Sequence, residues 1–401
     1  MNRWGAQSSV FILIHHFRAK MINKKFINST KRIIFHYPLS IDKYGKSGST
    51  LRPYKMIKAF EDCGYFVDVV SGDVNSRKEA IRTIKNNFKK GIRYDFLYSE
   101  STTMPTLLCE KNHIPKSPLL DYLFWFWFKR NCGPVGLFYR DIYWRFNDYK
   151  SNLNFLKRTY AKFFYWADLV AYRLIVNVVF LPSNLMISYI PKFIRPKSYH
   201  SLPPGCDLKE TKDKKDKKDL RLLYIGSIAP PYYNIKPLLE VMSRSEFAKL
   251  IICCPKDQWV KYSHLYDETI NNNINIVHES NKNLDKLYEE SDFVVVFREN
   301  NEYLKFSMPY KIFEAIGYNK PIIINKDCEA GRYINYYRIG ATVSSGEELY
   351  NLLLKINNER SIIDQYIVNI KNNKNKFTWQ ARALEAKNKL MENNENSHFR
   401  T

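Results

Sequence analysis

Short apolar runs alternate with amphipathic segments of helical period along the chain, beginning near residue 31. The run "RIIFHYP" (Arg32–Pro38) is followed by a glycine-containing loop (Lys43–Pro53), by an amphipathic segment that ends at Gly64, and by the run "FVDVVSG". We therefore expect a strand, a loop, a helix and a second strand, which form the βαβ unit of a doubly wound parallel sheet. The runs "YDFLYSES", "VGLFYRD" and "VNVVFLPS" continue the pattern.

The alternation stops at "KETKDKKDKKD" (209–219), which has no apolar residue and predicts a solvent-exposed linker. It restarts with "LRLLYIGSI" and ends with an amphipathic helix in "FTWQARALEAKNKLM". Two consecutive sets of apolar parallel strands predict an α/β protein with two Rossmann-like domains. The expected divisions are an extension (1–30), an N-terminal domain (31–205), a charged linker (206–220), a C-terminal domain (221–376) and a C-terminal helix and tail (377–401).

The net charge of +23 is distributed unevenly between the two halves. Residues 1–205 contain 33 Lys and Arg against 13 Asp and Glu, a net charge of +20, whereas residues 206–401 contain 30 against 27, a net charge of +3. The basic half predicts an anionic partner, which could be nucleic acid, an acidic lipid surface or a phosphate-bearing substrate. A composition biased towards Lys and Asn is the alternative, but it leaves the asymmetry unexplained.

Two segments of the basic half, 119–130 and 160–175, combine many aromatic residues with Lys and Arg. Buried helices are one interpretation; together with the basic charge, the segments favour docking on an anionic membrane surface. No uncharged run reaches the roughly 18 residues that a membrane-spanning helix requires. The seven cysteines form no CxxC pair, which indicates a reducing compartment. We therefore expect a cytoplasmic protein, peripheral at the inner face of the cell membrane.

Candidate ligand-binding loops follow the strands of the second half, because ligands bind at the carboxyl ends of strands in open α/β sheets. These loops contain Gly226–Ser227, Arg298 and the segment that starts at Ser307. Ser307 or Met308 is placed to cap a helix whose first residue is Pro309. The free N–H groups at the start of such a helix can hold a phosphate.

Lys311 and Glu314 follow in the next turns of this predicted helix. Lys311 is close enough to add positive charge to a phosphate site, and Glu314, about 10 Å along the helix from Ser307, suits the hydroxyls of a ribose. The alternative is an exposed i,i+3 ion pair on an amphipathic helix, which the spacing alone favours.

The stretch "SMPYKIFEAIGYNKPIIIN", together with "LLYIGSIAPPYYNIKPLLEVM" and "FTWQARA", resembles bacterial glycosyltransferase family 4, which consists of retaining enzymes of the GT-B architecture. "KSGSTLRPYKMIKAF" and "GLFYRDIYWRF" resemble the N-terminal domain of its capsule and surface-polysaccharide members. The resemblance covers residues 31 to about 390. It implies the GT-B fold, in which two Rossmann-like domains face each other across a cleft.

The resemblance also implies roles for single residues. Glu314 matches the glutamate that holds the nucleotide ribose, and Ser307 to Lys311 match the diphosphate site. Gly226 and Ser227 match a loop that approaches the donor phosphates. The glycine loop that faces the cleft is matched by Gly48, Ser49 and Thr50.

Arg140 and Asp141 lie where many relatives place a histidine and an aspartate beside the donor sugar; a loop ion pair or a strand-end cap is the alternative.

The sequence departs from the family pattern at two places. Phe306 occupies the position of the first, sugar-binding glutamate of the family's E-x7-E element. The arginine and lysine that usually clamp the diphosphate are absent from the loop "GSIAPPYYN". We therefore expect Lys311, Arg298 and the helix dipole to neutralise the charge of the diphosphate.

We therefore predict a retaining glycosyltransferase that moves a sugar from a UDP- or GDP-linked donor to a glycan acceptor, carried on a lipid, in capsule, O-antigen or exopolysaccharide synthesis. No DxD motif and no metal-ligand spacing occur, so we expect neither a metal nor a cofactor. Two alternatives remain open. One is a GT-B sugar-nucleotide 2-epimerase. The other is a basic nucleic-acid binder, for which the sequence has no RNA- or DNA-binding motif.

Overall fold

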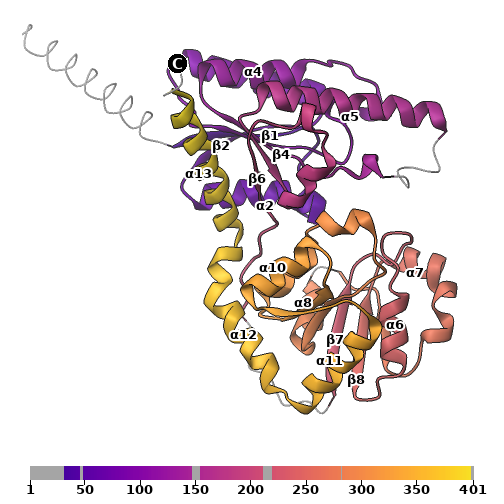
Figure 1. The fold of residues 1–401 in the computed structure, drawn as a ribbon. Helices are drawn as coiled ribbons and strands as arrows, with labels where there is room; N and C mark the ends of the chain where they lie inside the picture. Colours follow the sequence, from indigo (N-terminus) through magenta and orange to yellow (C-terminus); the bar gives the residue numbers. More distant parts are fainter. Residues whose placement is uncertain (1–30, 46–47, 147–153, 211–218, 281, 399–401) are drawn as a thin grey trace, which may run out of the picture.

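The structure is a computed structural model that describes residues 31–45, 48–146, 154–210, 219–280 and 282–398 (Figure 1). Within these ranges the chain forms two six-stranded parallel sheets, and helices cover both faces of each. The predicted α/β class with two Rossmann-like domains is therefore confirmed. The expected extension (1–30) and most of the charged segment (211–218) lie outside the described residues.

The N-terminal sheet has the strand order β2-β1-β3-β4-β5-β6. The order reverses at β1, as it does in doubly wound sheets. Successive residues of β1 point to opposite faces, since Ile34 packs in one core cluster and Ile33 and Phe35 in another. The strands are β1 (Arg32–Tyr37), β2 (Phe66–Ser71), β3 (Leu97–Glu100), β4 (Val135–Phe138), β5 (Val178–Leu181) and β6 (Tyr199–Ser201).

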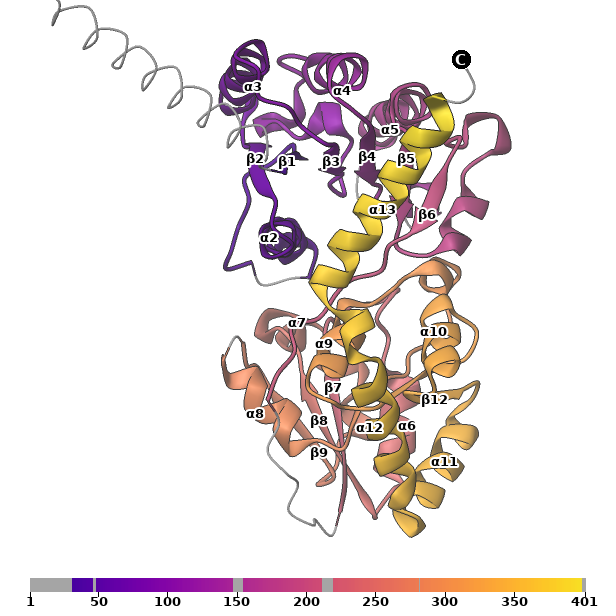
Figure 2. The ribbon, with the colours of Figure 1, turned by 90° about the vertical axis from the view of Figure 1, so that its left-hand side faces the viewer.

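Two layers of helices cover the N-terminal sheet (Figure 2). The layer away from the C-terminal sheet consists of α3 (Val74–Lys89), α4 (Leu120–Asn131) and α5 (Phe155–Ile175). The other layer consists of α2 (Gly48–Asp62) and α13 (Trp379–His398). Local caps define the helix starts: the side chain of Asp73 accepts the N–H of Ser76 at α3.

The C-terminal sheet has the order β12-β11-β10-β7-β8-β9, so its order reverses at β7. Its strands are β7 (Leu220–Ile225), β8 (Ala248–Cys253), β9 (Ile274–Val277), β10 (Phe293–Val296), β11 (Ile322–Asn325) and β12 (Gly340–Val343). Its helices are α6 (Lys236–Ser243), α7 (Lys256–Tyr262), α8 (Lys282–Glu290), α9 (Tyr310–Gly317), α10 (Glu329–Tyr337), α11 (Gly346–Asn358) and α12 (Ser361–Asn373).

The last helix, α13, returns from the C-terminal domain to the N-terminal domain (Figure 2). Trp379, Ala383 and Leu390 pack in the core cluster that α2 shares with the first sheet. The Cβ of a larger residue at Gly136 in β4 would lie 2.9 Å from the Leu390 methyl groups, so α13 lies directly on this sheet. The chain therefore connects the two domains twice, before β7 and again at α13.

Two details of the predicted elements are wrong. Helix α2 begins at Gly48 and contains Pro53, whereas we expected a loop up to that proline. A proline inside a helix removes one backbone hydrogen bond, and burial of Met56, Ala59 and Phe60 offsets this loss. The short strands β6 ("YHS") and β12 ("GATV") were not predicted, because neither contains a continuous apolar run.

Candidate functional site

The loops after β10 and β11, the residues just before α9 and the first residues of α10 line a cavity of about 510 Å³. Among the residues that line it are Arg298, Glu299, Ser307, Pro309, Asn325 and Arg332. Asn325 holds the loop after β10 in place: its Oδ1 accepts the N–H of Arg298 (3.0 Å) and its Nδ2 donates to the carbonyl of Arg298 (2.8 Å). A rigid, polar opening at the carboxyl ends of parallel strands is where an open α/β sheet binds its ligand.

The start of α9 lies at the edge of this cavity, one residue later than predicted. Pro309 is the cap residue and Tyr310 begins the helix, so the expected cap at Ser307 or Met308 is wrong. The hydroxyl of Ser307 instead donates to the carbonyl of Leu304 (3.0 Å), which closes the preceding 3₁₀ helix η8 (Glu302–Phe306). Ser307 and Pro309 still line the cavity, and Met308 packs against the core.

Lys311 and Glu314 form the ion pair that the spacing favoured. Lys311 Nζ lies 2.6 Å from Glu314 Oε2, and the side chains are 26% and 24% exposed. The buried Tyr288 hydroxyl also donates to Glu314 (3.1 Å), and burial, followed by the Glu314 charge, raises the pKa of Tyr288 well above its ordinary value. Neither residue of the pair lines the cavity: Glu314 meets Tyr288 of α8, and no residue of α8 is among those that line the cavity.

The loop after β7 has a conformation that requires glycine. Gly226 has φ +151°, and no heavy atom other than the Tyr224 hydroxyl lies within 4 Å of the place where a Cβ would be. Ser227 is occupied within the loop: its hydroxyl donates to Gln258 Oε1 (2.9 Å), which also accepts the N–H of Ile228 (3.1 Å). The open approach to this loop is therefore at Gly226.

The predicted glycine loop lies against α9, across the interface between the domains. A Cβ on Gly48 would come within 2.5 Å of Tyr310 Cβ and Cγ, so the starts of α2 and α9 are in contact. Thr50 follows in the first turn of α2. The side chain of Ser49 lies outside the described residues. The structure thus brings together Gly48 and Tyr310 at the start of α9, which are far apart in the sequence.

Arg140 and Asp141 have separate partners. Arg140 Nη2 pairs with Glu100 (3.1 Å), a carboxylate with 0% exposure that also receives Arg52 Nε (3.1 Å). Asp141 is partly buried and accepts a hydrogen bond from the hydroxyl of Tyr303 in η8 (2.7 Å). Burial raises the pKa of Asp141 to about 6, against the lowering effect of its hydrogen bonds.

Phe306 is directed into the N-terminal domain. It is 2% exposed and belongs to the core cluster of that domain, where its ring stacks on Phe146 (6.0 Å between centroids). Its carbonyl accepts the hydroxyl of Ser183 (2.7 Å). The position for which the resemblance to family 4 implies a sugar-binding acid is therefore an apolar contact between the domains.

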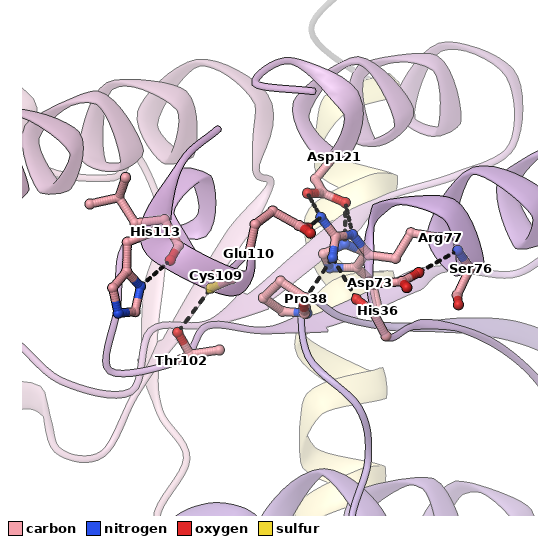
Figure 3. Close-up of polar contacts among 12 residues, drawn as sticks. His36, Pro38, Asp73, Ser76, Arg77, Thr102, Cys109, Glu110, His113 and Asp121 are labelled. Carbon is pink, nitrogen blue, oxygen red and sulfur yellow. Dashed lines mark hydrogen bonds and ion pairs between the residues drawn. The ribbon is translucent and has the colours of Figure 1, made fainter. Parts of the chain in front are cut away.

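Sequence reasoning missed the buried charges of the N-terminal domain (Figure 3). His36 lies between Asp121 (2.9 Å) and Ser99 (2.8 Å), and Arg77 pairs with both Asp121 (3.1 Å) and Glu110 (2.9 Å). Burial favours a higher pKa for Asp121, but His36 and Arg77 outweigh it and hold the pKa below its ordinary value. All are at least 92% buried, so they join β1, β3, α3 and α4 rather than meet a substrate. A histidine within the apolar run "RIIFHY" was the available signal.

Two further properties concern the whole described part of the chain. None of its helices is both long enough and apolar enough to cross a bilayer. Nor does any group of three or more His, Cys, Asp or Glu in the described ranges form a possible metal site.

No family model and no curated protein matches this chain. A glycosyltransferase from Rickettsia africae is 14% identical and superposes with a TM-score of 0.58, over 91% of this chain and 100% of that one. WaaG, a glycosyltransferase involved in lipopolysaccharide biosynthesis, is 13% identical with a TM-score of 0.54, over 89% and 99% of the two chains. An α-glucosyltransferase in complex with UDP and a 13-mer DNA containing an HMU base is 11% identical with a TM-score of 0.54, over 91% and 100%. At these identities the likeness establishes the fold: this chain has the GT-B fold of those glycosyltransferases.

Proposed function

We propose that this protein is a retaining glycosyltransferase that transfers a sugar from a UDP- or GDP-linked donor to a glycan acceptor in capsule, O-antigen or exopolysaccharide synthesis. The observation that carries the proposal is the arrangement around α9. A cavity with Arg298 reaches the residues just before the helix, the Lys311–Glu314 pair lies within the helix and outside the cavity wall, and Gly48 of the opposite domain lies against Tyr310 at the helix start.

In this proposal the donor lies across the start of α9. Its diphosphate meets the first N–H groups of the helix and the loop at Gly226, where the absence of a side chain allows close approach. The ribose hydroxyls donate to Glu314, whose position Lys311 and Tyr288 fix. As the bond to the sugar breaks, the diphosphate gains charge, which the helix dipole and Lys311 stabilise.

Asp141 and Arg140 supply the N-terminal side of the site. Arg140 is held by Glu100, which it shares with Arg52, so Arg140 orients the loop. Asp141, which is ionised above about pH 6, accepts a hydrogen bond from a sugar hydroxyl in place of the Tyr303 hydroxyl. Retention of the anomeric configuration is carried over from the resemblance to family 4.

The acceptor in this proposal is carried on a lipid, and α5 holds the enzyme at an anionic membrane at the inner face of the cell. Leu156, Tyr160, Phe163, Val170 and Leu174 are all exposed and recur at intervals of four, three, seven and four positions, which places them on one face of the helix. Four basic residues of α5 accompany this face: Lys157, Arg158, Lys162 and Arg173. The acidic residue of this helix, Asp168, is buried and only 3% exposed. An apolar stripe with basic flanks suits an anionic lipid surface.

The test of the donor site is steady-state kinetics with a nucleotide-sugar panel on Glu314→Ala. We expect the donor KM to rise about tenfold or more with little loss of kcat, because a hydrogen bond to a charged group contributes about 1.5–3 kcal/mol. Glu314→Gln keeps a hydrogen-bond acceptor for the Tyr288 hydroxyl but removes the negative charge. Comparison of the two variants therefore separates an effect on folding from an effect on donor binding. Glu289→Ala, on the exposed surface of α8, is the control. Unchanged donor kinetics in Glu314→Ala would refute the ribose role, and turnover without an acceptor would indicate a 2-epimerase.

A further inference from the structure

The cationic side chains that line the cavity differ in their partners. Lys305 Nζ lies 2.6 Å from Glu302, and Arg332 Nη1 lies 2.6 Å from Glu329. Arg298 has no carboxylate within ion-pair distance among the described residues. Of the three cations Arg298, Lys305 and Arg332, Arg298 is therefore the one without a carboxylate partner in the described part of the chain.

The guanidinium of Arg298 also keeps an unused donor. Its Nε is buried and has no hydrogen-bond partner within the described part of the chain. The guanidinium lies over the ring of Tyr233 (5.1 Å), and Asn325 fixes the backbone on both sides of the residue. A buried donor without a partner costs about 1–3 kcal/mol, which a ligand with a suitable acceptor would recover. A carboxylate fits this fork, because its two oxygens accept two parallel N–H bonds.

The position of the missing sugar-binding acid is not available to a ligand in the cavity, because the side chain at position 306 points into the other domain. Two other carboxylates line the cavity: Glu299, whose Oε2 accepts from Asn234 Nδ2 (2.7 Å), and Asp327, which is exposed in the loop after β11. Arg298 lies beside these acids as a cation with an unused donor. A neutral sugar has no acidic group for Arg298 to bind, whereas an anionic sugar gains an ion pair with it.

We propose that the donor sugar carries a carboxylate, as a uronic acid does, and that Arg298 binds this carboxylate. The inference rests on the proposed function, because it assumes a nucleotide-sugar donor across the start of α9. It goes further by assigning Arg298 to the sugar, while the diphosphate remains with the N–H groups of α9, the Gly226 loop and Lys311.

The position of Arg298 favours the sugar over the diphosphate. Leu304 and Lys305 of η8 line the cavity together with Arg298, and η8 reaches the N-terminal domain through the hydrogen bond from Tyr303 to Asp141 (2.7 Å). Arg298 therefore lies where the two domains meet, which is where the transferred sugar has to face its acceptor. Glu314 and Lys311, which mark the nucleoside side, lie outside the cavity wall, and Glu314 contacts Tyr288 of α8.

The test is calorimetric titration of the full chain with donors that differ by one group. UDP-glucose and UDP-glucuronate, and GDP-mannose and GDP-mannuronate, form pairs in which a CH₂OH group is replaced by a carboxylate; UDP and GDP report on the diphosphate alone. We expect one acidic donor to bind at least tenfold more tightly than its neutral counterpart. Arg298→Gln should abolish this difference and leave the affinity for the nucleoside diphosphate unchanged. Arg332→Gln, which changes a cation already paired with Glu329, should retain the difference.

Each other outcome overturns the assignment. Equal affinity of the wild-type protein for both members of each pair would refute an acidic donor, and this comparison does not depend on whether any variant folds. A loss of UDP or GDP affinity in Arg298→Gln, equal to the loss for the sugars, would assign Arg298 to the diphosphate and leave the proposed function intact. Absence of binding to every nucleotide would refute the proposed function and this inference with it.

Discussion

The substitution Asp141→Asn is expected to stabilise the folded protein at neutral pH while it lowers transfer activity. Burial raises the pKa of this carboxyl to about 6, whereas an aspartate in an unfolded chain titrates near about 3.9. Between these two values the folded state holds the proton more tightly than the unfolded state. The free energy of unfolding therefore falls as the pH rises from about 4 to about 6, and the variant lacks this fall.

The size of the effect follows from the two pKa values. One pKa unit corresponds to about 1.4 kcal/mol, so a difference of about two units amounts to about 3 kcal/mol over the full titration. Between pH 4.5 and 8 the same relation gives about 2 kcal/mol. Because Asp141 is partly exposed, solvent screening makes this value an upper bound. The hydrogen bond from Tyr303 is kept by the asparagine oxygen.

The assay is urea denaturation at several pH values from 4.5 to 8, on the wild-type protein, on Asp141→Asn and on Glu246→Gln, which changes an exposed carboxylate. The difference in stability between wild type and Asp141→Asn should grow by about 1–2 kcal/mol across this range in favour of the variant. The control should follow the wild type throughout. If all three proteins show parallel stability profiles, the elevated pKa of Asp141 is refuted.

Two further predictions concern the domain contact and the membrane. Gly48→Ala should lower donor kcat/KM at least tenfold with little change in thermal stability. The Cβ of the alanine would lie 2.5 Å from Tyr310 and would separate α2 from α9. Unchanged kinetics would contradict the contact between the two helices. Phe163→Glu should reduce binding to phosphatidylglycerol vesicles about tenfold or more in a sedimentation assay. Val260→Glu, at an exposed apolar residue of the other domain, should bind as the wild type does, and an equal loss in both variants would argue against α5 as the docking face.

The strands of both sheets could be predicted because most of them are continuous apolar runs, and such runs bury both faces of a parallel strand. Five of the six residues of β1, and all of β4, β5 and β10, are buried in this way. The order of strands, loops and helices then fixed the α/β class. The starts of helices were less predictable. The sequence around Pro309 fits a helix in which this proline is the first helical residue as well as one in which it is the cap, so it does not decide between the two.

The interior of the site could be predicted only in part, because side-chain direction depends on contacts between distant segments. The sequence indicates that Lys311 and Glu314 are three positions apart, but not that Tyr288 completes the pair. The aromatic segment 119–130 was interpreted as one membrane-facing unit, yet Trp125 is fully buried while Leu123 is 59% exposed. Periodicity alone does not decide which side of a uniformly apolar helix meets the core.

The direction of Phe306 and the contact between the domains have a common origin in η8. This segment contacts the N-terminal domain at three points: Glu302 accepts the Tyr189 hydroxyl (2.8 Å), Tyr303 donates to Asp141 (2.7 Å), and the Phe306 carbonyl accepts the Ser183 hydroxyl (2.7 Å). A segment anchored in this way cannot also point a side chain at position 306 into the cavity. If the cavity binds the sugar, as we propose, other residues of its wall have to recognise it, and Arg298 lines the cavity with an unused buried donor.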